Sequence, residues 1–389
     1  MFIDYQLIGF DILIAFAYLV LFVKESDLMR KQIAMYLFSF VIFVVFSQLI
    51  FNKQFSAKQG LFSSGLDTAK YIIYLFSISF FVFTRKLSAF PVFHVKPLYS
   101  VSYFDLILSL PIAAFFLFYA STTGVRLSGE FLDHVGERSI WVDYMYVYCI
   151  VCLVVLRGSS SVVILVVLLA IAHFLAAERM RAFVYIMSLL IIFYNIQNKK
   201  YQSSIVLLSG FLLATIIGFA RHVEGQLNDA YNVTHFGSVT ISSLFLLDES
   251  LSFTALQQTK FFIGSIVANL VPSSFLSEEY NIRLFLVNAQ DIPGGGWLPV
   301  WSFVIGGFIG VFALATVIAI FYRWMMNTGT VSSKYDLAKY TMLVIFLATL
   351  PRWFMYTPYQ ILKMPLYGYI GTFLLVSFIE VFSKRKSFG

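Results

Sequence analysis

The chain has 389 residues, of which 60% are hydrophobic and only 12% are charged, and its mean hydropathy is +0.84. Soluble domains carry roughly 25% charged residues, so this composition argues against a soluble globular protein. The formal net charge of +7 would suggest nucleic-acid binding in a soluble protein. Here many basic residues lie in short loops between apolar runs, where they orient helices in a membrane, so we expect no nucleic-acid partner.

Apolar runs long enough to cross a bilayer recur along the whole chain. They predict an all-α polytopic membrane protein with about eleven transmembrane helices. The expected helices are residues 5–23, 33–51, 71–84, 104–120, 141–156, 161–177, 182–196, 203–220, 300–322, 338–350 and 364–382. Helices 1–8 fall within residues 1–220, one long loop covers residues 221–299, and helices 9–11 fall within residues 300–389. We expect these parts to form a single integrated membrane domain.

The charges of the loops predict an orientation. Basic residues such as Lys24, Arg85 and the terminal Lys384-Arg385-Lys386 gather on one side, whereas acidic residues such as Glu130 and Glu224 gather on the other. Loops rich in lysine and arginine stay in the cytoplasm. We therefore expect a multi-pass membrane protein with its N-terminus outside and its C-terminus in the cytoplasm.

The long loop at 221–299 is predicted to lie on the outer side of the membrane and to contain short interfacial helices. Its apolar stretch from Phe261 to Leu270 is too short to span a bilayer and is ended by Pro272. The loop closes on Gly294, Gly295 and Gly296. Consecutive glycines allow the backbone to approach a ligand closely, and their N–H groups can bind an anion. A flexible turn before the next helix is the alternative interpretation.

Arginines at the outer ends of the predicted helices are the strongest indication of function. Cationic side chains there run against the positive-inside tendency and are costly near lipid. The guanidinium fork matches the geometry of phosphate, so several together suggest a shared site for an anionic ligand. The alternative is that each one extends separately to lipid headgroups. The residues concerned are Arg179, Arg181, Arg221, Arg283 and Arg352, together with Lys363.

Candidate proton acceptors lie near these arginines in the sequence. Asp291 precedes the three glycines and His222 follows Arg221, so either could take a proton from an attacking hydroxyl. Each could equally be an ordinary loop residue, and His173 is interpreted as a packed helix residue. No His, Asp or Glu cluster has metal-ligand spacing, so we expect no metal and no other cofactor.

Aromatic residues near the predicted outer face have two interpretations. Trp297, Trp301 and Trp353 could stack on sugar rings, or they could belong to the interfacial belt of a membrane protein. The sequence favours the belt slightly for each of them.

Three local stretches resemble the Wzy-type polymerases of O-antigen and capsular repeat units. They are Glu178-Arg179-Met180-Arg181 at the head of a helix, Ile266 to Pro272 followed by Gly294-Gly295-Gly296 and a glycine-containing helix, and Pro351-Arg352-Trp353 before the last helix. The chain departs from that family after the glycines, where Trp297 to Trp301 replace a serine and an acidic residue. Ser273 also replaces a basic residue. The acidic residue of the family therefore has no counterpart directly after the glycines.

The resemblance implies a membrane-embedded glycosyltransferase of the C type. It would join undecaprenyl-pyrophosphate-linked oligosaccharides at the periplasmic face of a bacterial inner membrane, with a chain-length-regulating co-polymerase as partner. The resemblance thus implies that the N-terminus and the long loop are periplasmic. On this hypothesis Arg181, Arg221 and Arg352 neutralise the leaving pyrophosphate, and Asp291 or His222 acts as base. The expected substrate-binding residues are Arg179, Arg283, Lys363, Gly294, Gly295 and Gly296.

Two other functions fit the same architecture. An O-antigen ligase would transfer the glycan to lipid A-core instead of extending it. A transporter or lipid-linked oligosaccharide flippase would be expected to carry ionisable residues deep in the membrane. Charged residues here cluster mainly at one face, with Asp11 the main exception, which favours an enzyme.

Overall fold

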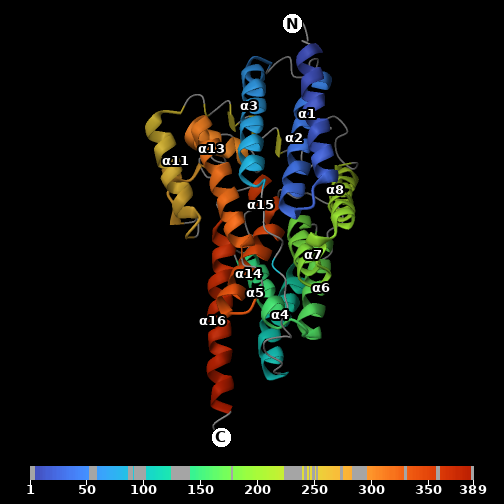
Figure 1. Cartoon of the computed structure of the whole chain (residues 1–389), viewed down its shortest axis with the longest axis vertical. Coiled ribbons are helices and arrows are strands. Elements are labelled where there is room, and N and C mark those ends of the chain that lie inside the picture. Colours follow the sequence, from blue (N-terminus) through green and yellow to red (C-terminus); the bar gives the residue numbers. More distant parts are fainter. Residues whose placement is uncertain are drawn as a thin grey trace. The chain divides into compact units, whose positions relative to one another are not determined.

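The computed structural model consists of helices and connecting turns, with no strand among the residues that it describes (Figure 1). It describes residues 5–51, 59–85, 91, 102–123, 141–176, 178–222, 239–240, 243–244, 246–247, 250, 253–271, 275–282, 296–327, 331–355 and 360–386.

A helix lies at each of the eleven apolar segments that the sequence predicts, with ends that differ by a few residues in most cases. These helices are α1 (Tyr5–Lys24), α2 (Leu28–Phe51), α3 (Gln59–Phe83), α4 (Ser102–Thr123), α5 (Trp141–Val155), α6 (Ser160–Leu175), α7 (Arg179–Tyr194), α8 (Lys200–His222), α13 (Leu298–Met326), α14 (Lys334–Ala348) and α16 (Lys363–Lys386). Shorter elements are η2 (Ile196–Asn198), α11 (Ala255–Ala268), η4 (Glu278–Tyr280) and α15 (Leu350–Met355).

Three of the described helices are long and apolar enough to cross a membrane. They are Phe104–Thr122 of α4, Leu298–Met326 of α13 and Lys363–Phe382 of α16, and α5, α6 and α7 are shorter apolar helices. An apolar helix suits a bilayer because its backbone groups are all paired within the helix. That all eleven helices cross the membrane, with the predicted orientation and periplasmic loop, stays a prediction.

Side-chain caps mark the beginnings of several helices. Ser333 precedes α14, where its hydroxyl accepts a hydrogen bond from the Asp336 N–H while the Asp336 carboxylate accepts one from the Ser333 N–H. This reciprocal pair satisfies two backbone donors that have no acceptor within the helix. Thr254 and Gln257 form the same arrangement at the start of α11.

The chain divides into two compact units. Unit 1 comprises residues 1–86, 197–320 and 350–360, and unit 2 comprises residues 87–196, 321–349 and 361–389. In unit 1, α1, α2 and α8 lie side by side (Figure 1). In unit 2, α14 contacts α16, α5 and α7, and α6 contacts α4 and α7. α14 is buried at almost every residue from Leu337 to Ala348, so it lies at the centre of that unit.

The end of the predicted long loop packs into the core of unit 1. The indole N–H of Trp297 donates to the Thr240 hydroxyl at 3.1 Å, and its backbone N–H donates to the Ser243 hydroxyl at 2.8 Å. Its ring contacts Phe40 and Phe354, with centroids 5.1 and 6.0 Å away. Part of this loop is therefore core, because it supplies buried hydrogen bonds and ring contacts.

Three tryptophans differ from both sequence interpretations. Trp297, Trp301 and Trp353 are only 1%, 3% and 0% exposed. Side chains buried to this degree neither face a sugar nor form a surface belt. Their large rings instead fill the interior of unit 1, where burying apolar area stabilises the fold.

α13 is bent. Gly306 has φ −145° and ψ 17°, and Gly307 has φ 59° and ψ −155°, both outside the helical region. The Gly307 conformation is one that glycine adopts and other residues avoid. Beyond the bend, a Cβ atom on Gly310 would lie 2.4 Å from the Ser302 carbonyl oxygen. Eight residues of straight helix would separate these two by about 12 Å, so the bend brings them together.

Candidate functional site

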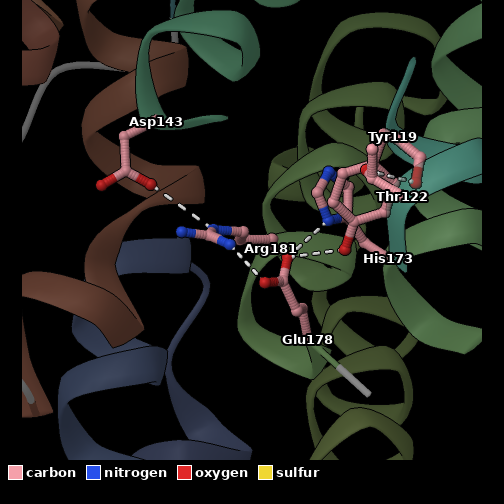
Figure 2. A network of polar contacts seen from close by, with 6 residues as sticks. All are labelled: Tyr119, Thr122, Asp143, His173, Glu178 and Arg181. Carbon is pink, nitrogen blue, oxygen red and sulfur yellow. Dashed lines mark hydrogen bonds and ion pairs between the residues drawn. The ribbon is translucent and has the colours of Figure 1, made fainter. Parts of the chain in front are cut away.

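A cluster of five polar side chains lies in the interior of unit 2 (Figure 2). Tyr119 comes from α4, Asp143 from α5, His173 from α6 and Arg181 from α7, while Glu178 lies in the turn between α6 and α7. Four apolar helices thus each contribute one polar group to the same place. Burying polar groups among apolar helices costs free energy unless these groups pair with one another.

The turn between α6 and α7 positions the acidic residue at the centre of the cluster. The Glu178 N–H donates to the His173 carbonyl oxygen at 2.8 Å, and the Arg181 N–H donates to the Glu178 carbonyl oxygen at 3.0 Å. These backbone bonds end one helix and begin the next within a few residues. They bring the side chains of His173, Glu178 and Arg181 to one side of the turn.

Glu178 binds three partners with its two carboxylate oxygens. Oε2 accepts a hydrogen bond of 2.9 Å from the Tyr119 hydroxyl and lies 2.7 Å from Nδ1 of His173. Oε1 lies 2.5 Å from a terminal nitrogen of Arg181. Burial by itself would raise the pKa of Glu178, but the bonds to His173 and Arg181 outweigh it and hold that pKa well below its ordinary value. The carboxylate is therefore ionised at neutral pH.

His173 is held in one orientation and is fully buried. Its ring contacts the rings of Tyr119 and Tyr185, with centroids 4.2 and 5.5 Å away. Because the Glu178 carboxylate is ionised, we assign the ring proton to Nδ1, which then donates to that carboxylate. Nε2 faces no hydrogen-bond partner among the described residues. The ring is thereby placed to orient Glu178.

Arg181 is shared between two carboxylates. Its Nε atom lies 3.5 Å from Asp143 in addition to the contact with Glu178, and its side chain is 11% exposed. Asp143 also interacts electrostatically with Lys363, which is buried at the start of α16. With a neutral His173, the two cations and two anions leave the cluster without net charge. The Arg181 guanidinium thus pairs with carboxylates from both α5 and the turn before α7.

The structure brings together two of the cationic residues predicted from the sequence. Arg181 and Lys363 both interact with Asp143 in unit 2. Arg352 belongs to unit 1, where it lies partly buried on α15 and has partners of its own. Arg179 is the first residue of α7 and precedes Arg181 by two residues, and its side chain lies outside the described part of the structure.

The remaining predicted site residues are described only in part. Arg221 and His222 are the last two residues of α8, and their side chains lie outside the described residues. Gly296 is described, and it is buried so closely that a Cβ atom would lie 2.7 Å from the indole nitrogen of Trp301. Wholly outside the described residues are Arg283, Asp291, Gly294 and Gly295.

Sequence reasoning did not identify Asp143 and Glu178 as site residues, and it interpreted His173 as packing alone. His173 is indeed buried in the helix, but it also holds Glu178. One signal was present, since Glu178 precedes Arg181 by three residues and such pairs meet at a helix end. Nothing in the local sequence links Asp143 to Arg181, because they lie on different helices.

Within the described residues, no group of three or more His, Cys, Asp or Glu side chains is arranged to hold a metal ion. The cluster is an ion-pair and hydrogen-bond network. Comparison of the chain with protein-family models, with curated proteins and with solved structures found no match in any of the three.

Proposed function

We propose that this chain is a membrane glycosyltransferase that polymerises undecaprenyl-pyrophosphate-linked oligosaccharide repeat units into a surface polysaccharide. In this proposal all eleven apolar helices cross the bacterial inner membrane, and the reaction occurs at the periplasmic face. The growing glycan is the donor, and a hydroxyl of the next repeat unit is the acceptor. The bond from the anomeric carbon to pyrophosphate breaks, a glycosidic bond forms, and the hydroxyl proton passes to a base.

The observation that carries the proposal is the placement of Arg181 at the first turn of an apolar helix, between Glu178 and Asp143. Keeping a guanidinium among apolar helices costs free energy, which two carboxylates offset here. An arginine fixed in advance loses little entropy when it binds phosphate, and its fork fits two phosphate oxygens. This preorganisation suits the stabilisation of charge that develops on a departing pyrophosphate.

In this proposal the other arginines also bind the departing pyrophosphate. Arg181 and Lys363 are offset by Asp143 and Glu178, so the cluster cannot by itself neutralise a pyrophosphate that carries several negative charges. The proposal therefore needs Arg179, which shares the first turn of α7 with Arg181. It also assigns the leaving group to Arg221 and Arg352. Arg283 and the glycines at 294–296 are proposed to bind the remainder of the substrate.

Proton removal is assigned separately from charge neutralisation. His173 is fully buried and its Nδ1 atom is engaged with Glu178, so it is a positioning residue in this proposal. Asp291 or His222 is proposed to accept the hydroxyl proton. Pyrophosphate is a good leaving group, so orientation and charge contribute more to the rate than the base does.

The decisive experiment is reconstitution of the purified protein with synthetic undecaprenyl-pyrophosphate-linked repeat units, without added metal or nucleotide sugar. A ladder of repeat-unit multiples on a gel would support polymerisation. A single transfer that requires added lipid A-core would identify a ligase instead. Folded protein that yields neither product from the native repeat unit would contradict glycosyl transfer.

Variants test the assignment of the arginines within the same assay. Arg221→Ala and Arg352→Ala should each abolish the ladder without lowering the amount of folded protein. Arg323→Ala is the matched control, because Arg323 lies in the last turn of α13 and has no assigned role. Wild-type ladders from Arg221→Ala would refute the proposed neutralisation of pyrophosphate.

A further inference from the structure

Six cationic side chains gather at one end of unit 1, where α1 and α3 end and α2 and α8 begin. Each of them takes part in the contacts that join these four helices, or lies next in the chain to a residue that does. We name this group the basic end of unit 1. Its members are Lys24, Arg30, Lys31, Arg85, Lys199 and Lys200.

Two neighbouring residues of α2 make the contacts between the helices. A terminal nitrogen of Arg30 donates to the Thr84 carbonyl oxygen at 3.3 Å, directly after the end of α3. Lys31 Nζ donates to the Ser203 hydroxyl at 2.7 Å and also to the Lys200 carbonyl oxygen, both in the first turn of α8. The end of α3 and the beginnings of α2 and α8 therefore lie close together.

The carboxylates at this end are already engaged. Oε2 of Glu25 lies 3.1 Å from Arg30, and its Oε1 accepts hydrogen bonds from two backbone N–H groups. The Asp27 carboxylate accepts the Arg30 N–H at 2.9 Å and thereby caps the start of α2. Within the described part of the chain, no carboxylate forms an ion pair with Lys31 or Lys200. Two carboxylates thus accompany six cations, and the basic end carries a net positive charge.

The positions of the cations add to the electrostatic cost. Arg30 and Lys31 lie in the first turn of α2, and Lys200 begins α8, and neither first turn contains an acidic residue. The N-terminus of a helix carries a partial positive charge, so anions are favoured there and cations are not. Lys31 is also 0% exposed, which keeps water away from its ammonium group. A bound anion would offset these costs.

A ligand can reach the outer members of the basic end. Lys24 and Arg85 are exposed, and Lys200 is partly exposed. Arg30 has a donor to spare, because its buried Nε atom forms no hydrogen bond with the described residues. The arginine fork and the lysine ammonium groups are the side chains that bind phosphate oxygens most strongly. The chemistry of the basic end therefore fits a phosphate group.

Exposed apolar side chains border these cations. Val23 lies in the last turn of α1, Val82 in the last turn of α3 and Tyr201 in the first turn of α8. They are 48%, 62% and 72% exposed. A free phosphate ion gains nothing from apolar surface, whereas a lipid places its acyl chains along a helix and its phosphate at the helix end. The combination of cations and apolar side chains favours a lipid.

We propose that the basic end of unit 1 binds the headgroup of an anionic membrane lipid. Its phosphate contacts are Lys24, Arg85 and Lys200, and its acyl chains lie along the exposed apolar sides of the helices. Arg30 and Lys31 keep their present contacts and add to the attraction, since charges near a protein interior interact more strongly than charges in water. The lipid thereby neutralises the place where the four helices meet.

This inference goes beyond glycosyl transfer and does not depend on it. The basic end belongs to unit 1 and the Glu178 cluster to unit 2. The inference requires only that the chain lies in a membrane, which its apolar helices indicate. Lipid binding is measured on purified protein without any glycan substrate, so its outcome is separate from that of the ladder assay.

Native mass spectrometry of the full-length, delipidated protein in detergent tests the proposal. Dioleoyl phosphatidylglycerol should bind more tightly than dioleoyl phosphatidylcholine, which has the same acyl chains and no net charge. Lys200→Gln and Arg85→Gln should each weaken phosphatidylglycerol binding about fivefold, the effect of one basic residue at an anionic membrane surface. Lys260→Gln is the matched control, because it removes a lysine of α11 that is paired with Glu279, and it should leave this binding unchanged.

These variants keep the contacts that hold the helices together. Lys31 bonds to the backbone carbonyl of Lys200, which remains in Lys200→Gln, and thermal unfolding checks that each variant is folded. Inorganic phosphate is the third probe, and stabilisation by it equal to that by phosphatidylglycerol would assign the site to free phosphate and overturn the lipid proposal. Equal affinity for the two lipids would also overturn it, as would wild-type affinity in a variant that combines Arg85→Gln with Lys200→Gln.

Discussion

Nδ1 of His173 lies 2.7 Å from Oε2 of Glu178, and the two side chains are 0% and 8% exposed. The other oxygen of the same carboxylate contacts Arg181. One buried acid thus joins the end of α6 to the start of α7 and fixes a histidine and an arginine together. A change at Glu178 disturbs both partners at once, which makes it the most informative residue to alter in this unit.

Replacing Glu178 with Gln should destabilise the protein strongly. The amide keeps the shape but leaves the Arg181 guanidinium short of one buried anion, and breaking such a pair costs about 3 to 5 kcal/mol. Thermal unfolding in detergent measures the effect. The matched control is Glu279→Gln, which breaks the exposed pair with Lys260 and should leave the midpoint unchanged. Equal midpoints for both variants would contradict a structural role for Glu178.

The contribution of Glu178 should disappear in acid. Its folded pKa is lowered from an ordinary value of 4.5, so its stabilisation is complete above that pH and is lost as the pH falls through the folded pKa. The difference in unfolding midpoint between wild type and Glu178→Gln should be constant near neutral pH and should shrink below pH 4.5. A difference that stays the same in acid would argue against an ionised carboxylate.

Replacing Arg181 with Lys should separate its charge from its geometry. A lysine keeps the positive charge but cannot bridge Glu178 and Asp143 with a planar fork. If Arg181 stabilises the departing pyrophosphate, we expect polymer formation to slow by about 10²- to 10³-fold. Initial rates of ladder formation provide the measurement, with Arg323→Lys as control. An unaffected rate in Arg181→Lys would mean that charge alone is sufficient there.

Three glycines of α13 should differ in their tolerance of alanine. Gly307→Ala introduces a side chain at φ 59°, which costs on the order of 1 to 3 kcal/mol. Gly310→Ala places a Cβ atom 2.4 Å from the Ser302 carbonyl oxygen and must displace that backbone. Gly306→Ala is the control, because its φ is −145° and its Cβ would meet nothing within 4 Å. Unfolding midpoints should fall for the first two variants only, and a straight α13 would instead make all three neutral.

The positions of the helices could be predicted from the amino-acid sequence. Each apolar run that the sequence predicts as a helix corresponds to a helix in the structure, because continuous apolar runs of this length are typical of helices. The sequence was less informative where apolar periodicity ends. α3 begins at Gln59, twelve residues before the predicted segment, and its first turns are polar. The sequence also contains no clear pattern that predicts α15 or the bend in α13. The bend depends on which backbone segment lies next to Gly310, and this is set by the packing.

The contacts between polar groups could not be predicted from the sequence and became known only from the folded structure. Arg181 was recognisable as an unusual residue, but its partner Asp143 comes from another helix. Asp11 appeared as an isolated exception, whereas in the fold it is paired with Lys70, 59 residues away. The hydropathy of a segment depends only on the residues of that segment, so it predicts where a helix lies. Ion pairs between distant segments depend on how helices are packed and rotated, which no local pattern records.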